Sequence, residues 1–245
     1  MKVLVCITHV PDTTAKVSFK ENGTLFDESG VQFIIGPYDD YALSRAIDLK
    51  ASHQARVVVL NVGTAASDPT IRKALATGAD AAVRIDAEPV DSFFVANQIA
   101  QYAKDKDFDL ILMGRESIDH NGGMVHGMVG ELLEMPSVSP VMRLELDGKT
   151  ALMDREIEGG KETIRLELPF VAGCQEPIAE WKIPNMRGIM TARSKPLDVL
   201  PVFEGAVAVQ AVRYGKIEKK QLCKMFEPSQ MEELVEALRG EAKVL

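Results

Sequence analysis

The sequence predicts an α/β fold: a doubly wound, mostly parallel sheet with an antiparallel hairpin region and a C-terminal arm. Three observations lead to this prediction. Short apolar runs recur near residues 3, 57, 82 and 110 with helical patterns between them, and such alternation is typical of parallel strands joined by right-handed crossovers. After Pro136, β-rich segments alternate with glycine turns. Beyond residue 191, prolines and weak periodicity replace regular patterns.

Local signals place the elements of the first half. Asn22-Gly23 lies in a polar stretch and predicts a hairpin or an excursion. Asp39 or Asp40 is placed to cap a helix that follows Gly36-Pro37, and Asp91 or Ser92 to cap another. The expected strands are 3–7, 31–35, 56–62, 82–85 and 110–113, and the expected helices are 41–49, 70–76, 92–102 and 124–133.

The second half reads differently. Antiparallel hairpins are expected from segments 144–146, 151–157 and 162–168, followed by a strand at 169–173. The stretch 181–190 has apolar side chains but weak periodicity. Ser229-Gln-Met-Glu232 has the spacing of a capping box that opens a terminal helix. We therefore expect an α/β domain over 1–191 and an arm over 192–245.

Composition restricts the classes of function. The chain of 245 residues carries a net charge of −8, which argues against nucleic-acid binding because that affinity comes from neutralised phosphates. No apolar run approaches the roughly 20 residues that cross a bilayer, so we expect no membrane insertion. The start of the chain does not have the pattern of a signal peptide, and the three widely spaced cysteines suit a reducing compartment. A cytoplasmic protein is expected.

The segment 109–128 is the most informative one. An apolar run ends at Gly114, a polar loop leads to Gly122 and Gly123, and a helical pattern follows. Strand, glycine loop and helix start together present free backbone N–H groups to an anion such as phosphate. An ordinary βα connection is the alternative, since glycines also close tight turns. The strand ends at 8–11, 61–63 and 114–116 are expected to converge on one crevice of the parallel sheet, which favours a nucleotide.

The sequence contains no recognisable catalytic or metal motif. There is no Cys-x-x-Cys, no histidine pair at ligand spacing, no nucleophile elbow, no Walker loop and no Gly-x-Gly-x-x-Gly after the first strand. His9 at a strand end could be an acid–base group, but a lone histidine more often makes one hydrogen bond. Asp119 is expected to bond loop amides or a ribose hydroxyl. We expect neither a catalytic centre nor a metal site.

Seven segments in a specific order resemble one known family, the β subunit of electron transfer flavoprotein. They are Val3-Leu-Val5 with Val10-Pro-Asp12, Gly36-Pro37, Thr70-Ile-Arg-Lys-Ala-Leu-Ala-Thr-Gly-Ala-Asp80, Gly114-Arg-Glu-Ser-Ile-Asp119, Arg155-Glu-Ile-Glu-Gly-Gly160, Leu168-Pro169 and Ile183-Pro-Asn-Met186. The resemblance covers about residues 1–200.

The resemblance implies an adenine-nucleotide-hydrolase-like fold and a heterodimer with an α subunit that holds most of the redox FAD. It further implies an electron carrier without bond-making catalysis of its own, which takes part in fatty acid oxidation, and a structural AMP in the β subunit. The residues expected at the cofactor are Cys6, Gly36, Pro37, Tyr38, Asp39, Val62, Gly114, Arg115, Glu116, Ser117, Ile118, Asp119, His120, Asn121, Gly122, Gly123, Met124 and Val125.

Two further sets follow from the resemblance. Arg155 and Glu156 match residues that hold the mobile flavin domain in its orientations. A loop within 176–191 matches the one that docks acyl-CoA or other dehydrogenases; its expected docking residues are Ile183, Pro184, Asn185 and Met186, with Ile183 as the apolar anchor. The terminal helix is expected to pack on the α subunit.

The chain also departs from the family. Its loop after Asp119 is richer in glycine than that of many members, Thr13 stands where some members have an aromatic residue, and the tail beyond about residue 200 is longer than in the mitochondrial type.

Two alternative functions stay open. One is an electron-bifurcating form with a second FAD in the β subunit, although the loop lacks the Thr-x-x-Val pattern associated with it. The other is a stress-protein-like ATP- or AMP-binding module, in which residues 150–190 would have no purpose. An ATP pyrophosphatase would need a Ser-Gly-Gly loop after the first strand, where the chain has Thr8-His-Val-Pro11.

Overall fold

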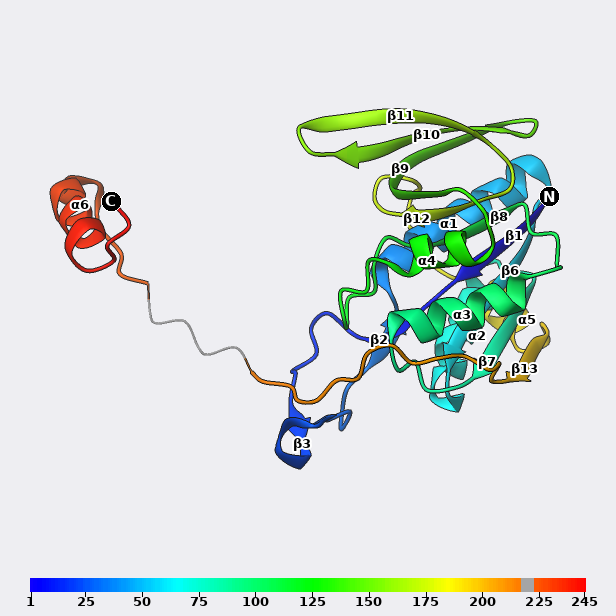
Figure 1. Ribbon diagram of the computed structural model, residues 1–245, viewed down its shortest axis with the longest axis horizontal. Coiled ribbons are helices and arrows are strands. Elements are labelled where there is room, and N and C mark those ends of the chain that lie inside the picture. Colours follow the sequence, from blue (N-terminus) through cyan, green and yellow to red (C-terminus); the bar gives the residue numbers. More distant parts are fainter. Residues whose placement is uncertain (217–222) are drawn as a thin grey trace. The chain divides into compact units, whose positions relative to one another are not determined.

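The computed structural model describes residues 1–216 and 223–245 and confirms the α/β fold with a mostly parallel sheet (Figure 1). The described chain forms two compact units. The larger unit contains residues 1–17 and 27–212, and the smaller unit contains 18–26 and 213–245. Each unit is described separately below.

The larger unit contains the sheet and five of the helices. Its strands are β1 (Lys2–Cys6), β2 (His9–Pro11), β5 (Phe33–Ile35), β6 (Arg56–Gly63), β7 (Ala81–Asp86), β8 (Leu110–Gly114), β9 (Ser137–Asp147), β10 (Thr150–Ile157), β11 (Gly160–Glu167), β12 (Phe170–Cys174) and β13 (Leu197–Pro201). Its α-helices are α1 (Pro37–His53), α2 (Asp68–Thr77), α3 (Ser92–Ala103), α4 (Val125–Leu132) and α5 (Met186–Ala192).

Nine strands form the main sheet in the order β11-β10-β9-β12-β8-β1-β6-β7-β13. The hairpin strand β10 pairs antiparallel with both β9 and β11, and the other pairs in this sheet are parallel. The chain passes from β1 to β6 and β7 on one side and later to β8 on the other side of β1. The order therefore reverses between β1 and β8, which is where ligands of doubly wound sheets bind.

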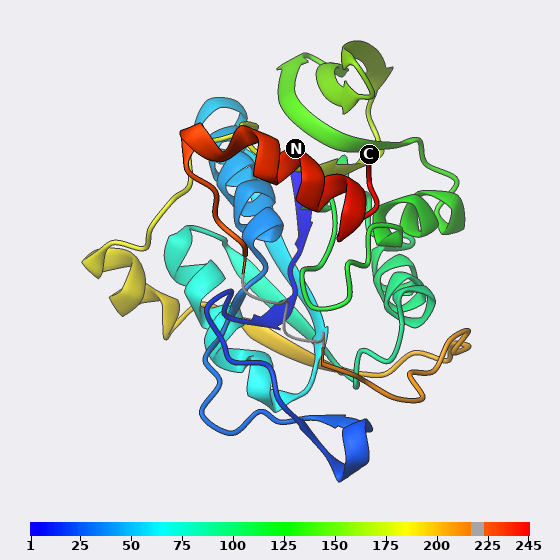
Figure 2. The same ribbon diagram turned by 90° about the vertical axis from the view of Figure 1, so that its left-hand side faces the viewer.

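Helices cover both faces of this sheet. Figure 2 shows the blue and cyan helices α1 and α2 on one side and the green helices α3 and α4 on the other. Buried side chains of α1 and α2 share one core cluster with Val3, Val5 and Leu112 of the central strands. Side chains of α3 and α4 share the second cluster with Leu4 and Ile111. Adjacent residues along a strand thus point to opposite cores.

The expected arm contributes a strand to the main sheet. Leu197–Pro201 pairs parallel with β7, from Ala82 to Asp86. Pro201 cannot lie inside a helix, because proline has no backbone N–H to donate. It is tolerated in β13 because this strand lies at the edge of the sheet. The following segment is tied to α3: Gln98 bonds the backbone N–H and C=O of Phe203 at 2.8 and 3.0 Å. The compact unit therefore extends to residue 212, beyond the boundary that we expected at 191.

The smaller unit contains the hairpin of β3 (Phe19–Lys20) and β4 (Leu25–Phe26) and the helix α6 (Met231–Gly240). The predicted turn at Asn22-Gly23 is therefore confirmed. The predicted capping box at Ser229 and Glu232 is wrong. The box is formed by Glu227 and Gln230, two residues earlier, because Pro228 is already suited to the first helical position. Within the described ranges, no helix is long and apolar enough to span a membrane.

Candidate functional site

Asp39 joins the ends of the two strands at the point where the sheet order reverses. Its carboxylate accepts hydrogen bonds from Thr8 N (2.8 Å), Thr8 Oγ1 (2.6 Å) and Gly114 N (2.8 Å). Thr8 follows β1 and Gly114 ends β8, so their N–H groups have left the strand ladder. The expectation that Asp39 or Asp40 caps α1 is wrong, since no side chain caps this helix at Gly36. Asp39 satisfies donors of other elements instead.

Burial determines the protonation of groups at this crevice. Asp39 is only 3% exposed, and burial raises the pKa of its carboxyl to about 6 while the bonds from Thr8 and Gly114 oppose the shift. Burial also raises the pKa of the Cys6 thiol, with the Asp39 charge as a second cause. Cys6 therefore remains a protonated thiol and is not activated as a nucleophile. Its side chain packs in the core that α3 and α4 cover.

Two predicted site glycines allow the chain to pack closely around Asp39. A Cβ on Gly36 would lie 2.4 Å from Thr8 Oγ1, and one on Gly114 would lie 2.6 Å from Asp39 Oδ1. Both distances are far below van der Waals contact, so any larger residue would displace the buried carboxylate. These two glycines are needed for the packing of the crevice wall.

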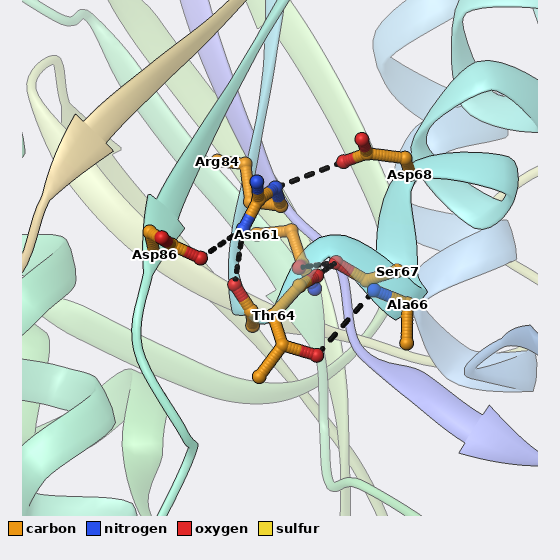
Figure 3. Close-up of polar contacts among 8 residues, drawn as sticks. Asn61, Thr64, Ala66, Ser67, Asp68, Arg84 and Asp86 are labelled. Atoms are coloured by element: carbon orange, nitrogen blue, oxygen red, sulfur yellow. Dashed lines mark hydrogen bonds and ion pairs between the residues drawn. The ribbon is translucent and has the colours of Figure 1, made fainter.

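The β6 side of the crevice is closed by its own polar contacts (Figure 3). Asn61 Nδ2 donates to the Ile7 carbonyl at 2.9 Å, which joins the ends of β6 and β1. Arg84 donates to the Gly63 carbonyl at 3.0 Å, pairs with Asp86, and lies 2.8 Å from Asp68. Since two carboxylates already neutralise this guanidinium, it is not available to a phosphate. Val62, the predicted site residue here, is buried. The strand ends therefore converge as predicted.

The loop from Gly114 to Val125 is exposed along most of its middle. Asp119 Oδ1 accepts from Ser117 Oγ (2.6 Å) and His120 N (2.9 Å), so it bonds a loop amide as expected. A Cβ on Gly122 would lie 3.2 Å from Ser92 Oγ, which places the loop beside the start of α3. The exposed loop residues are Asp119, His120, Asn121, Gly123 and Met124, whereas Glu116, Ser117, Ile118, Gly122 and Val125 are half-buried.

Arg115 lies between the loop and the first turn of α1. Its guanidinium stacks on the Tyr38 ring at 4.7 Å from the centroid and donates to Gln175 Oε1 (2.9 Å) and Glu116 Oε1 (3.2 Å). Its Nε is buried with no hydrogen-bond partner, as is Nδ1 of His126 in the first turn of α4. Pro37 and Tyr38 beside it are half-buried. Two unsatisfied nitrogens flanking one loop fit a polar ligand such as a nucleotide.

Gln175 is a site residue that sequence reasoning missed. It follows β12 directly, is 7% exposed, and donates to Glu156 Oε2 at 2.7 Å while accepting from Arg115. Arg155, beside Glu156 on β10, pairs with Glu162 across the hairpin. Gln175 thus joins Arg115 at the crevice to Glu156, one of the two predicted orientation residues, whereas Arg155 makes a separate pair. A polar residue at the end of a buried strand was the available signal.

The expected docking residues lie far more exposed than the crevice. Ile183 is 73% and Met186 74% exposed, while Pro184 is half-buried. Asn185 is the N-cap of α5, since its side chain accepts from Gly188 N at 2.8 Å. Sequence reasoning left out Trp181 and Met190, which lie in the same segment and are 57% and 72% exposed. Their apolar character in an irregular segment was the available signal.

No constellation for bond-making chemistry is found in the described part of the chain. Within residues 1–216 and 223–245, no group of three or more His, Cys, Asp or Glu side chains could hold a metal ion. His9 bonds Thr70 Oγ1 through Nδ1 at 2.7 Å and stacks on Phe33. It therefore makes the ordinary structural contact of a strand-end histidine.

The comparisons with known proteins agree on one family. The family model for the electron transfer flavoprotein domain matches residues 23–204. The chain is 34% identical, over an alignment 259 residues long, to the electron transfer flavoprotein subunit beta of Bacillus subtilis (strain 168), with 100% of both chains covered. It is 30% identical to the human subunit of that name over 206 residues, or 82% of this chain and 81% of the human one.

A third relative carries a different name. It is the caffeyl-CoA reductase-Etf complex subunit CarD of Acetobacterium woodii, 30% identical over 204 residues, which are 81% of this chain and 78% of that one. The match of the family model and the full-length similarity agree with the fold described above. The chain belongs to the electron transfer flavoprotein family and is a β subunit of it.

Proposed function

We propose that this β subunit accepts electrons from dehydrogenases through an FAD held mainly by its α subunit, and that it binds AMP as a structural ligand. The observation that supports this best is the crevice itself. It lies at the reversal of the sheet and has buried nitrogens without partners, at Arg115 and His126. The crevice offers no activated nucleophile at Cys6, because burial keeps that thiol protonated. A site of this kind suits binding rather than turnover.

The residues that would hold AMP are those of the crevice. The exposed backbone of the loop from Gly114 to Val125 supplies N–H groups at the start of α4, which suit a phosphate. Arg115 supplies the one cation with an unsatisfied nitrogen on this loop. Asp39 orders the wall through Thr8 and Gly114. AMP bound here would stabilise the strand ends without being transformed.

Bound FAD supplies the electron transfer. The β chain would orient the flavin domain and dock the dehydrogenases. Glu156 has one carboxylate oxygen fixed by Gln175 while its side chain remains exposed. Such an anion, held in one place, can pair with a cation of a mobile flavin domain. Arg155 is already paired with Glu162 and would help to hold the hairpin.

Docking of acyl-CoA or other dehydrogenases would use the exposed surface around Ile183. Single exposed apolar side chains are common on protein surfaces, but several within one short segment indicate a protein contact. Ile183→Ala should raise the KM of an acyl-CoA dehydrogenase for the heterodimer by about tenfold, as expected for a central apolar anchor. Flavin content should not change. A variant that loses flavin instead would contradict the docking role.

The cofactor assignment is tested by purification. The chain expressed alone should be colourless, and co-expression with its α subunit should give a yellow heterodimer with one FAD. Extraction of the denatured heterodimer and mass analysis should recover one AMP for each FAD. A heterodimer without AMP, from cells and buffers that contain it, would overturn the structural role.

The electron-bifurcating form remains the second candidate because one relative is named as a subunit of a caffeyl-CoA reductase complex. The same extraction separates the two candidates. Two FAD and no AMP in each heterodimer would favour the bifurcating form, as would a visible flavin spectrum from the isolated β chain.

A further inference from the structure

One stripe of helix α1 holds the start of the docking segment, which we define as residues 181–192. Asp40, Ser44 and Asp48 are spaced four residues apart, so they lie on one face of α1. Ser44 is 1% exposed, and its Oγ accepts from Lys182 N at 3.1 Å. One turn later, Asp48 Oδ1 lies 2.7 Å from Lys182 Nζ. Both the backbone and the side chain of Lys182 are therefore fixed to α1.

The third residue of the stripe lies beside Trp181. Asp40 is 7% exposed and its Oδ2 lies 3.7 Å from Lys73 Nζ. The same ammonium group lies 6.0 Å from the centre of the Trp181 ring. Asp40 and Lys73 thus form a charged border along the indole, immediately before Lys182.

Helix α2 holds the other end of the docking segment. Arg72 Nη1 donates to the carbonyls of Ala192, the last residue of α5, and of Lys195 beyond it, both at 2.8 Å, and so satisfies one acceptor at the helix end. Gly188 lies so close to α2 that a Cβ on it would be 2.2 Å from the Ala76 carbonyl oxygen. The exposed side chains of Ile183 and Met186 lie between these two attachments.

We propose that Ser44 and Asp48 are positioning residues for dehydrogenase docking: by fixing Lys182 to α1, they hold Ile183 in the conformation that enters the partner. This inference rests on the docking role proposed above. A contact segment that is ordered before binding loses less conformational entropy on binding, and affinity rises accordingly. Neither residue needs to touch the dehydrogenase or the flavin.

The test uses the full αβ heterodimer with the double variant Ser44→Ala, Asp48→Asn. Hydrogen exchange measured by mass spectrometry should become faster in peptides that cover 182–192 and stay unchanged at the crevice. The KM of an acyl-CoA dehydrogenase that reduces the unmodified heterodimer should rise about threefold or more, since the variant removes a partly exposed ion pair and leaves an amide unpaired. The kcat at saturating dehydrogenase should stay within about twofold.

Glu145→Gln is the matched control, because it removes the exposed ion pair of Arg143 and Glu145 on the hairpin. It should leave both measurements unchanged. A charge exchange adds a rescue: Asp48→Lys alone should accelerate exchange, and Asp48→Lys with Lys182→Asp should restore it. These two charge variants also test the proposal if the Ser44→Ala, Asp48→Asn variant folds poorly.

The outcomes are separable. If amide hydrogen exchange over 182–192 is unchanged in the variants, Ser44 and Asp48 do not hold Lys182 on α1. If exchange becomes faster but the KM is unchanged, the attachment exists and the positioning role is overturned. Ile183→Ala reports on docking itself: if it leaves the KM unchanged, the proposed docking function fails, whatever the exchange of the stripe variants shows.

Discussion

At Asp39, one buried carboxylate replaces the strand hydrogen bonds that end at the crevice. Three donors from two residues, Thr8 after β1 and Gly114 at the end of β8, converge on it, so removing the side chain would leave backbone N–H groups unpaired. Unpaired buried donors are costly. The carboxylate is kept although burial disfavours its charged form, and this conflict makes the stability of the protein depend on pH.

The pH dependence has a definite sign. Burial raises the pKa of Asp39 from its ordinary value of 3.8 to about 6. The folded state therefore holds the proton more tightly than the unfolded chain, and the stability this contributes is full below about pH 4 and lost as the pH rises through 6. The loss amounts to roughly 3 kcal/mol. As the pH is raised from 4.5 to 7, the urea concentration at which half of the protein is unfolded should decrease for the wild type relative to Asp39→Asn. A difference between the two proteins that stays constant with pH would contradict the assignment.

Gly114 allows a second prediction at the same place. A Cβ there would lie 2.6 Å from Asp39 Oδ1 and 2.7 Å from Tyr38 Cβ, so Gly114→Ala should destabilise the heterodimer by about 1–3 kcal/mol and lower its thermal midpoint by roughly 2–12 °C. Gly127→Ala is the control, because nothing lies within 4 Å of the added Cβ in α4. The control should stabilise slightly, since alanine favours helix. Equal effects of the two variants would refute the packing argument.

Local signals predicted the residues whose partners are close in the sequence. Asp91 caps α3 by accepting from Phe94 N, three residues away, and the sequence pattern was sufficient to expect it. Asp39 also precedes helical residues, but its donors Thr8 and Gly114 are 31 and 75 residues away. The choice between capping and bridging depends on tertiary structure. Gln175 was missed for the same reason.

At the scale of elements, α5 shows what periodicity cannot predict. It has only seven residues, which is too short to be stable alone. Its order comes from α2, through Arg72 at its end and the close approach at Gly188. A sequence window around 186–192 contains no sign of either partner, so an irregular segment was the reasonable expectation. The hairpins and the crossover helices were predictable because their patterns are longer and repeated.

Gly188→Ala should move α5 away from α2. The added Cβ would meet a backbone oxygen at 2.2 Å, which cannot rotate away as a flexible side chain could. We expect a loss of about 1–3 kcal/mol in stability, faster amide exchange over 186–192, and a higher KM for the dehydrogenase with unchanged flavin content. Gly127→Ala again provides the control. Retention of wild-type exchange at 186–192 would show that α5 does not depend on this contact.

At the scale of the whole molecule, alternation of strands and helices was enough to predict the parallel sheet and the converging strand ends. Given the order β8-β1-β6, right-handed crossovers place α1 on one face of the sheet and α3 on the other. The edge strand β13 was not predictable, because Leu197–Pro201 lies between prolines and gains its pairing only from the exposed edge of β7. The described part of the expected arm therefore divides into a strand of the larger unit and the helix α6 of the smaller unit.

Helix α6 has an apolar face that the described residues of its own unit cover only in part, since Leu234, Val235 and Leu238 are half-buried. Its stripe of Met231, Leu234, Val235 and Leu238 recurs at helical spacing, yet no residue of α6 is buried. We expect the α subunit to cover this face. Leu234→Asp with Leu238→Asp should weaken the heterodimer, because each change places a charge in an apolar contact.

Sedimentation of the heterodimer at decreasing concentration measures this effect. The double variant should dissociate at a concentration at least about tenfold higher than the wild type, as a loss of 1.4 kcal/mol or more requires, and should lose flavin on dilution. Glu236→Gln, a change at a polar position of α6, should behave as the wild type. If the double variant stays as tightly assembled as the control, α6 is not part of the subunit contact, and its apolar face must be covered by another partner or by the β chain itself.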